Sequence, residues 1–151
     1  MRAGVLVIGV GNELRGDDAA GPAVMRHLLG AGLQVAVCAG GTDLLELWEG
    51  AHTAVVVDAV TTGAPAGTIH RFDLSTQALH LSATPTGTHA LGLGDTLELG
   101  RALGRLPPRV IVYGIEGARF ELGEPMCAEV SEALPQAARR VRAEVAALAP
   151  A

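Results

Sequence analysis

Two adjacent carboxylates, Asp17 and Asp18, close the segment Gly9 to Asp18, which reads GVGNELRGDD. The four residues before Gly9 are Val, Leu, Val and Ile, a run that predicts a fully buried strand. Apolar residues at helical spacing follow the acids and predict a helix to about residue 28. One acid at a helix start is explained by capping. Two acids exceed that need, so the pair predicts a site at the end of the strand.

Asp17 and Asp18 cannot both face one site on a helix, because consecutive residues point about 100° apart. We assign Asp17 to capping and Asp18 to the chemistry.

A further carboxylate, Asp58, interrupts the carboxyl end of a second apolar strand, predicted over residues 53 to 59 (TAVVVDA). Asp is common where strands end, so Asp58 alone has an ordinary structural explanation. It nevertheless ends its strand at the same sheet edge as Asp18, and His89 opens a later predicted helix after a polar loop. Two carboxylates and one imidazole suit a borderline divalent metal such as nickel, zinc or iron.

The other histidines are interpreted as surface or packed residues, although spacing alone does not select His89 over His80. They are His27, His52, His70 and His80.

Strands and helices alternate along the chain, which predicts an α/β fold in a single domain, residues 1 to 151. Further strands are predicted over 34–39, 68–73 and 109–115, and further helices over 43–48, from His89 to about Leu103, and from about Met126 to Leu148. The connector 61–66 is too short for a crossover helix, so strand 68–73 should run antiparallel to strand 53–59, at a sheet edge. The polar stretch from Leu74 to Thr88 is a candidate substrate flap.

The composition excludes several classes of protein. The chain is 49% hydrophobic with a mean hydropathy of +0.35, which argues against disorder. A net charge of -5 and a pI near 5.4 give no basic surface for nucleic acid or an anionic membrane. The first apolar stretch is too short to span a bilayer and lacks a signal-peptide cleavage pattern, so we expect a cytoplasmic protein. Cys38 and Cys127 lack CxxC spacing and are interpreted as buried packing residues.

Other hydrolases and nucleotide-binding enzymes are disfavoured by specific absences. Leu14 stands where a dinucleotide-binding loop has its third glycine, and no GKS or GKT follows Gly16. The chain contains no GxSxG nucleophile motif, and Ser75, Ser82 and Ser131 lie in ordinary contexts.

Four motifs resemble those of the hydrogenase maturation endopeptidases, which trim the large subunit of nickel-iron hydrogenases. They are GVGNELRGDDAAGP at 9–22, AGGTDLLEL at 39–47, VVVDAV at 55–60 and THALGLGDTL at 88–97. The resemblance implies a three-layer sandwich, in which a five-stranded, mostly parallel, twisted sheet with one antiparallel edge strand lies between helices. It also implies that Asp18, Asp58 and His89 contact a metal and that the turn Gly40 to Thr42 borders the cleft.

The activity implied by the resemblance is one cut, which removes a C-terminal extension from a large-subunit precursor after nickel insertion. The nickel would belong to that precursor, because three ligands without an HExxH motif make a modest private site. Either the metal or a carboxylate could activate the water. A module that binds the loaded precursor without cutting it remains the alternative, and a monomer is expected.

Overall fold

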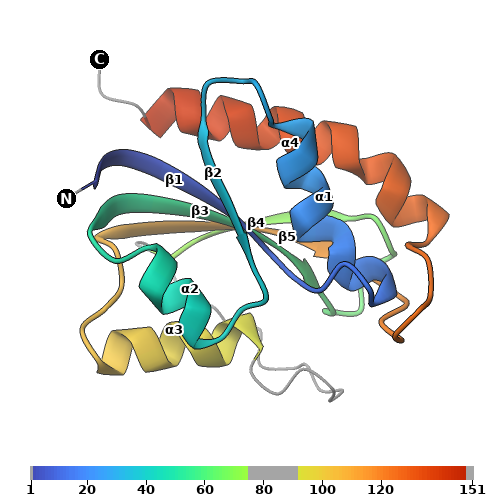
Figure 1. Ribbon diagram of the computed structural model, residues 1–151. Coiled ribbons are helices and arrows are strands. Elements are labelled where there is room, and N and C mark those ends of the chain that lie inside the picture. The colour runs from blue at the N-terminus through green and yellow to red at the C-terminus, as the bar shows by residue number, and fades with distance from the viewer. Residues whose placement is uncertain (1, 75–91, 149–151) are drawn as a thin grey trace.

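Five strands form the middle layer of the computed structural model, which describes residues 2 to 74 and 92 to 148. They are β1 (Arg2–Val10), β2 (Gln34–Cys38), β3 (Ala51–Val60), β4 (Ile69–Asp73) and β5 (Arg109–Glu116). The helices are the 3-10 helix η1 (Gly16–Ala19), α1 (Ala20–His27), α2 (Thr42–Leu47), α3 (Leu93–Ala102) and α4 (Ala128–Leu148). Helices α1 and α4 cover one face of the sheet, and α2 and α3 the other (Figure 1). The predicted three-layer α/β sandwich is confirmed.

The strand order is β2-β1-β3-β5-β4, and only β4 runs antiparallel to its neighbour. The predictions that residues 68 to 73 form an antiparallel strand and lie at an edge are therefore confirmed. Strand β4 does not lie beside β3, however, because β5 pairs with both. A short connector usually joins two neighbouring strands. Here β5, which comes later in the chain and is more hydrophobic than β4, lies between β3 and β4.

Strand β3 is buried at almost every position because both of its faces are covered. Its alternate residues therefore belong to two different cores. Val55 and Val57 pack with α1 and α4, whereas Ala54 and Val56 pack with α2 and α3. Aliphatic side chains dominate both cores, in agreement with the 3% aromatic content of the chain.

Two glycines bring the chain after β1 close to the sheet. Gly11 has φ of +147°, and a Cβ on it would lie 1.9 Å from the carbonyl oxygen of Asp18. A Cβ on Gly21 would lie 2.4 Å from the carbonyl oxygen of Val10 and 2.5 Å from that of Val57. Because these neighbours are backbone atoms, only glycine lets α1 pack this close to β1 and β3.

Two predicted helix starts were too early. Helix α3 begins at Leu93, after Gly92 in an extended conformation, whereas the prediction placed its start at His89. Helix α4 begins at Ala128 and not at Met126. The predicted flap beyond Leu74, together with His80 and His89, lies outside the described residues. Among the described helices, none is both long and apolar enough to cross a bilayer.

We expect the Gly21→Ala variant to be less stable than the wild type. Helix propensity alone would add roughly 1 kcal/mol of stability, but overpacking against fixed backbone costs about 1–3 kcal/mol or more. Urea denaturation measures the balance. Gly100→Ala in α3 is the matched control, since its new Cβ would meet only leucine methyl groups within 3 Å. Equal stability of the two variants would contradict the close packing of α1.

Candidate active site

Asp18 and Asp58 lie together at the carboxyl edge of the sheet, where two central strands meet. Asp18 is in η1, directly after β1, and Asp58 is near the end of β3, which pairs with β1. Since β2 lies on one side of β1 and β3 on the other, this is the switch point at which open α/β sheets bind ligands. Both acids are buried, with 8% and 9% of their surfaces exposed. The structure thus brings together two of the three predicted site residues.

Each of the two carboxylates accepts a hydrogen bond from a backbone N–H of the described residues. Asp18 Oδ2 accepts a hydrogen bond of 2.7 Å from the backbone N–H of Asn12. Asp58 Oδ1 accepts one of 2.8 Å from the N–H of Ala59. Burial, and then the nearby negative charge of Asp18, raise the pKa of Asp58 well above its ordinary value, against the opposing effect of the Ala59 bond. A proton or a cation at this pair is therefore favoured.

Asp17 does not cap a helix, so the prediction of capping was wrong. Neither η1 nor α1 has a side-chain cap. The fully buried Asp17 carboxylate instead accepts backbone N–H bonds from Ala118 (2.7 Å), Arg119 (2.9 Å) and Cys127 (2.8 Å). Burial raises the pKa of Asp17, but these three hydrogen bonds together lower it below its ordinary value.

Glu116, at the carboxyl end of β5, was not weighed as a candidate from the sequence. Its buried carboxylate accepts hydrogen bonds from the N–H and hydroxyl of Thr62 and from the N–H of Gly63, and lies 3.1 Å from His70 Nε2. Burial alone would raise the pKa of Glu116. The hydrogen-bond donors have the larger combined effect, so its pKa lies below the ordinary value. A satisfied carboxylate of this kind anchors the connector between β3 and β4. Its signal in the sequence was an acid ending an apolar strand, as at Asp58.

Cys38 ends β2 near the acid pair and is half-buried, whereas the sequence predicted a buried packing residue. Burial, followed by the charges of Asp43 and Asp58, raises the pKa of its thiol. Cys38 is therefore protonated at neutral pH. Its carbonyl oxygen accepts a 3.0 Å bond from Gly11, which fixes the adjacent turn Gly40 to Thr42 beside the loop after β1.

The remaining predicted positions are consistent with surface or packing roles where they are described. Asp43 and Asp95 are exposed helix residues. His27 and His52 are exposed, and His70 is half-buried. His89 lies outside the described residues, within which no three His, Cys, Asp or Glu side chains gather closely enough to hold a metal.

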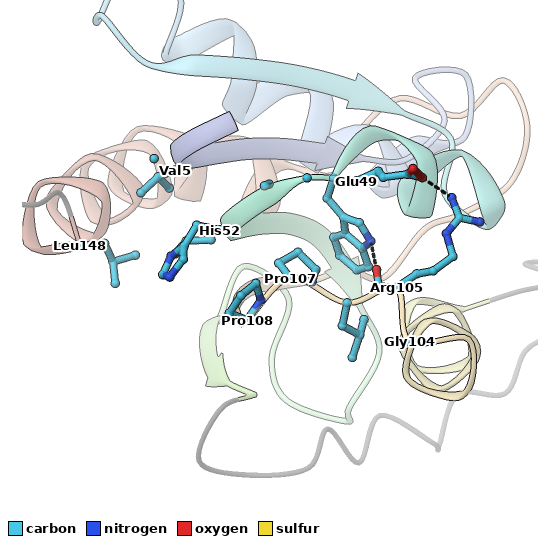
Figure 2. A pocket seen from close by; sticks show the side chains of 14 residues that line it. Val5, Glu49, His52, Gly104, Arg105, Pro107, Pro108 and Leu148 are labelled. Carbon is cyan, nitrogen blue, oxygen red and sulfur yellow. Dashed lines mark hydrogen bonds and ion pairs between the residues drawn. The ribbon is translucent and has the colours of Figure 1, made fainter. Parts of the chain in front are cut away.

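A cavity of about 750 Å³ lies at the opposite, amino-terminal edge of the sheet (Figure 2). Val5, His52 and Pro108 line it near the starts of β1, β3 and β5. Its polar groups are paired: Trp48 Nε1 donates to the carbonyl of Arg105 at 3.0 Å, and Arg105 pairs with Glu49. Because the described residues that line it include no pair of buried carboxylates, we place the functional site at the acid pair instead.

A family model described as hydrogenase maturation protease matches residues 24 to 144 of the chain. The chain belongs to this family. The match includes Asp58 and His89 and begins after Asp18.

Individual members of the hydrogenase maturation protease family support this assignment. The hydrogenase expression/formation protein HupD of Thiocapsa roseopersicina is 30% identical over 78% of this chain, and the alignment spans 56% of HupD. The [NiFe] hydrogenase maturation protease HybD of Thermococcus kodakarensis is 28% identical, with a TM-score of 0.71 over 94% of this chain and 99% of that one. The hydrogenase maturating endopeptidase HybD of E. coli, at 24% identity, shares the fold with a TM-score of 0.74 over 93% and 91% of the two chains.

We expect Asp17→Asn to destabilise this family member strongly at neutral pH. The amide cannot accept all three N–H bonds and its NH₂ group faces a backbone donor, which costs roughly 3–5 kcal/mol. Because the folded-state pKa of Asp17 is lowered, the carboxylate contributes its full stability above its ordinary pKa of 3.8 and loses it as the pH falls through the folded-state value. The difference in free energy of unfolding between Asp17→Asn and the wild type should therefore be large at pH 7 and smaller near pH 3. Asp43→Asn, an exposed acid, should change neither curve.

Metal-free Asp58→Asn protein should be at least as stable as the wild type. The raised pKa of Asp58 means that ionised Asp58 destabilises the fold, so wild-type stability falls as the pH rises from 3.8 through the folded-state value. The amide removes this charge and can retain the bond from Ala59. Thermal unfolding in a chelator, from pH 4 to pH 8, should give a difference that grows with pH. A variant less stable than the wild type at pH 8 would contradict the repulsion between the two acids.

Proposed function

We propose that this protein is an endopeptidase that removes a C-terminal extension from the nickel-loaded precursor of a nickel-iron hydrogenase large subunit. The observation that carries the proposal is the pair of buried carboxylates, Asp18 and Asp58, at the switch point of a hydrogenase maturation protease fold. Of the related proteins named above, HybD of Thermococcus kodakarensis is described as a [NiFe] hydrogenase maturation protease and HupD as a hydrogenase expression/formation protein. As the alignment spans only part of HupD, the activity and partner are proposed for this chain.

Asp18, Asp58 and His89 are proposed to contact the nickel that the precursor brings. The donor set fits, because carboxylate oxygens and imidazole nitrogen both suit a borderline divalent ion. Asp58, whose ionisation is disfavoured by burial and by the charge of Asp18, also gains from an added positive charge. We propose that the nickel belongs to the substrate and is not a resident cofactor, because three protein ligands without an HExxH motif make a modest private site.

Two routes to peptide hydrolysis use the same residues. In one, the substrate's nickel polarises the scissile carbonyl or helps to activate a water. In the other, Asp18 or Asp58 accepts the proton of the attacking water and the nickel serves for recognition. Burial and the charge of Asp18 raise the pKa of Asp58, which makes its carboxylate a stronger proton acceptor and supports the second route. The predictions of a monomer and of a cytoplasmic location stay predictions.

We expect the protein to shorten a nickel-loaded large-subunit precursor by one C-terminal peptide and to leave the nickel-free precursor intact. Intact mass spectrometry before and after incubation measures this directly. Asp58→Asn should abolish cleavage, because it removes a metal contact in one route and the proton acceptor in the other. Asp18→Asn and His89→Ala should reduce cleavage severely for the same reasons.

Asp95→Asn is the matched control, because Asp95 is an exposed acid in α3. This variant should cleave the precursor like the wild type. Retained processing by Asp58→Asn would refute both routes. Nickel-dependent complex formation without cleavage by the wild type would instead identify a binding module for the loaded precursor. Equal cleavage of the nickel-loaded and nickel-free precursors would contradict the proposed role of nickel and would still support the proposed endopeptidase activity.

A further inference from the structure

We propose that Leu14 and Leu122 form an apolar anchor that binds hydrophobic side chains of the precursor next to its metal site. This rests on the proposed function, because the precursor is the partner to which the surface is assigned. It adds a contact that recognises protein side chains, separate from the contact of Asp18 and Asp58 with the metal.

Both leucines are largely exposed although their loops are hydrogen-bonded to each other. Leu14 is 67% exposed, in the loop between β1 and η1, and Leu122 is 62% exposed, in the loop between β5 and α4. A single exposed leucine is ordinary on a protein surface. Two on neighbouring backbones, beside a candidate active site, form the kind of exposed apolar feature that marks an interaction site.

The two loops are bonded to each other and hold these leucines in place. The N–H of Gly123 donates to the carbonyl of Leu14 at 2.7 Å, and the N–H of Gly16 donates to the carbonyl of Glu124 at 3.1 Å. The buried Asp17 carboxylate adds its three bonds to the second loop. A surface fixed in this way loses little conformational entropy when a partner binds.

Asn12 connects the anchor to the acid pair. Its backbone N–H donates to Asp18 Oδ2 at 2.7 Å, and its side-chain Oδ1 accepts a 2.8 Å bond from the N–H of Leu14. Leu14 is thus held at a fixed position relative to the carboxylate proposed to contact the nickel. A precursor whose metal lies at Asp18 must place its neighbouring side chains near Leu14.

The charges around the anchor do not favour a charged ligand. Glu13 is ion-paired with Arg26, and the second loop exposes both Arg119 and Glu121. Because the signs are mixed, apolar contact is the recognition that this surface offers. The occupant is therefore an apolar segment of the precursor close to its nickel site.

The test compares Leu14→Ser/Leu122→Ser with Leu29→Ser. Leu29 is 70% exposed but follows α1, whose end lies at the opposite edge of the sheet, so it is a matched control. Binding of nickel-loaded precursor is measured in the Asp58→Asn background, and KM and kcat of cleavage with Asp58 intact. We expect the double variant to weaken binding and raise KM by about tenfold or more, with kcat within about twofold. The control should match its parent, and Leu14→Met/Leu122→Met should restore binding.

Unchanged binding and KM in the double variant would overturn the anchor while cleavage by the wild type upheld the proposed function. A fall in kcat at constant KM would also overturn it, because the leucines would then act through Asp18 and not by docking. Sedimentation of the wild type as a dimer that the double variant dissociates would replace the precursor with a second copy as the occupant. Wild-type binding without cleavage would refute the peptidase, and the dissociation constants would still decide the anchor. A wild type that neither binds nor cleaves would refute both.

Discussion

The carboxylate of Asp17 is bonded to three backbone N–H groups that come from residues more than a hundred positions later in the chain. These bonds join the loop after β1 to the loop after β5, and the N–H of Asp17 adds a 2.6 Å bond to the carbonyl of Arg119. The next residue, Asp18, therefore enters the switch point from a fixed backbone. Gly117 permits this arrangement, since a Cβ on it would lie 2.9 Å from the Cβ of Asp17.

Neighbouring buried acids acquire different roles here because their donors differ. Asp17 has three N–H donors, which lower its pKa in spite of burial. Its carboxylate is therefore ionised at neutral pH, and these donors compensate its charge. Asp58 has one donor and faces the charge of Asp18, which with burial raises its pKa. Only the second kind of carboxylate has a thermodynamic reason to bind a proton or a metal. Asp17 and Asp58 look equivalent in the sequence, but they differ in the number of backbone N–H donors that the described residues provide. Asp17 therefore has a structural role, whereas Asp58 is the candidate site residue.

Much of the fold followed from local patterns, because the apolar runs of β1, β3 and β5 are long and regular. Asp58 could be placed at the functional edge for the same reason, since its position is fixed within its own strand. The capping role given to Asp17 failed because its partners, residues 118 to 127, form no pattern that relates them to residue 17. The local patterns likewise did not determine that β5, and not β4, would pair with β3. Long-range pairing, and not secondary structure, is what the local patterns could not determine.

The position of the acid pair also explains why a substrate-borne metal is physically reasonable. Two carboxylates and one imidazole match the three protein ligands of many catalytic metal sites, and a cation held there would balance the charge at Asp58. Left without one, the folded protein retains an electrostatic cost at the switch point, held there by the Asp17 bonds and by the close approach of Gly21 to β1 and β3. Under the proposed function, a precursor that carries a divalent ion would remove that cost as it binds, whereas a metal-free precursor would not. The burial of Asp18 and Asp58 would then be a physical basis for discriminating loaded from unloaded precursors.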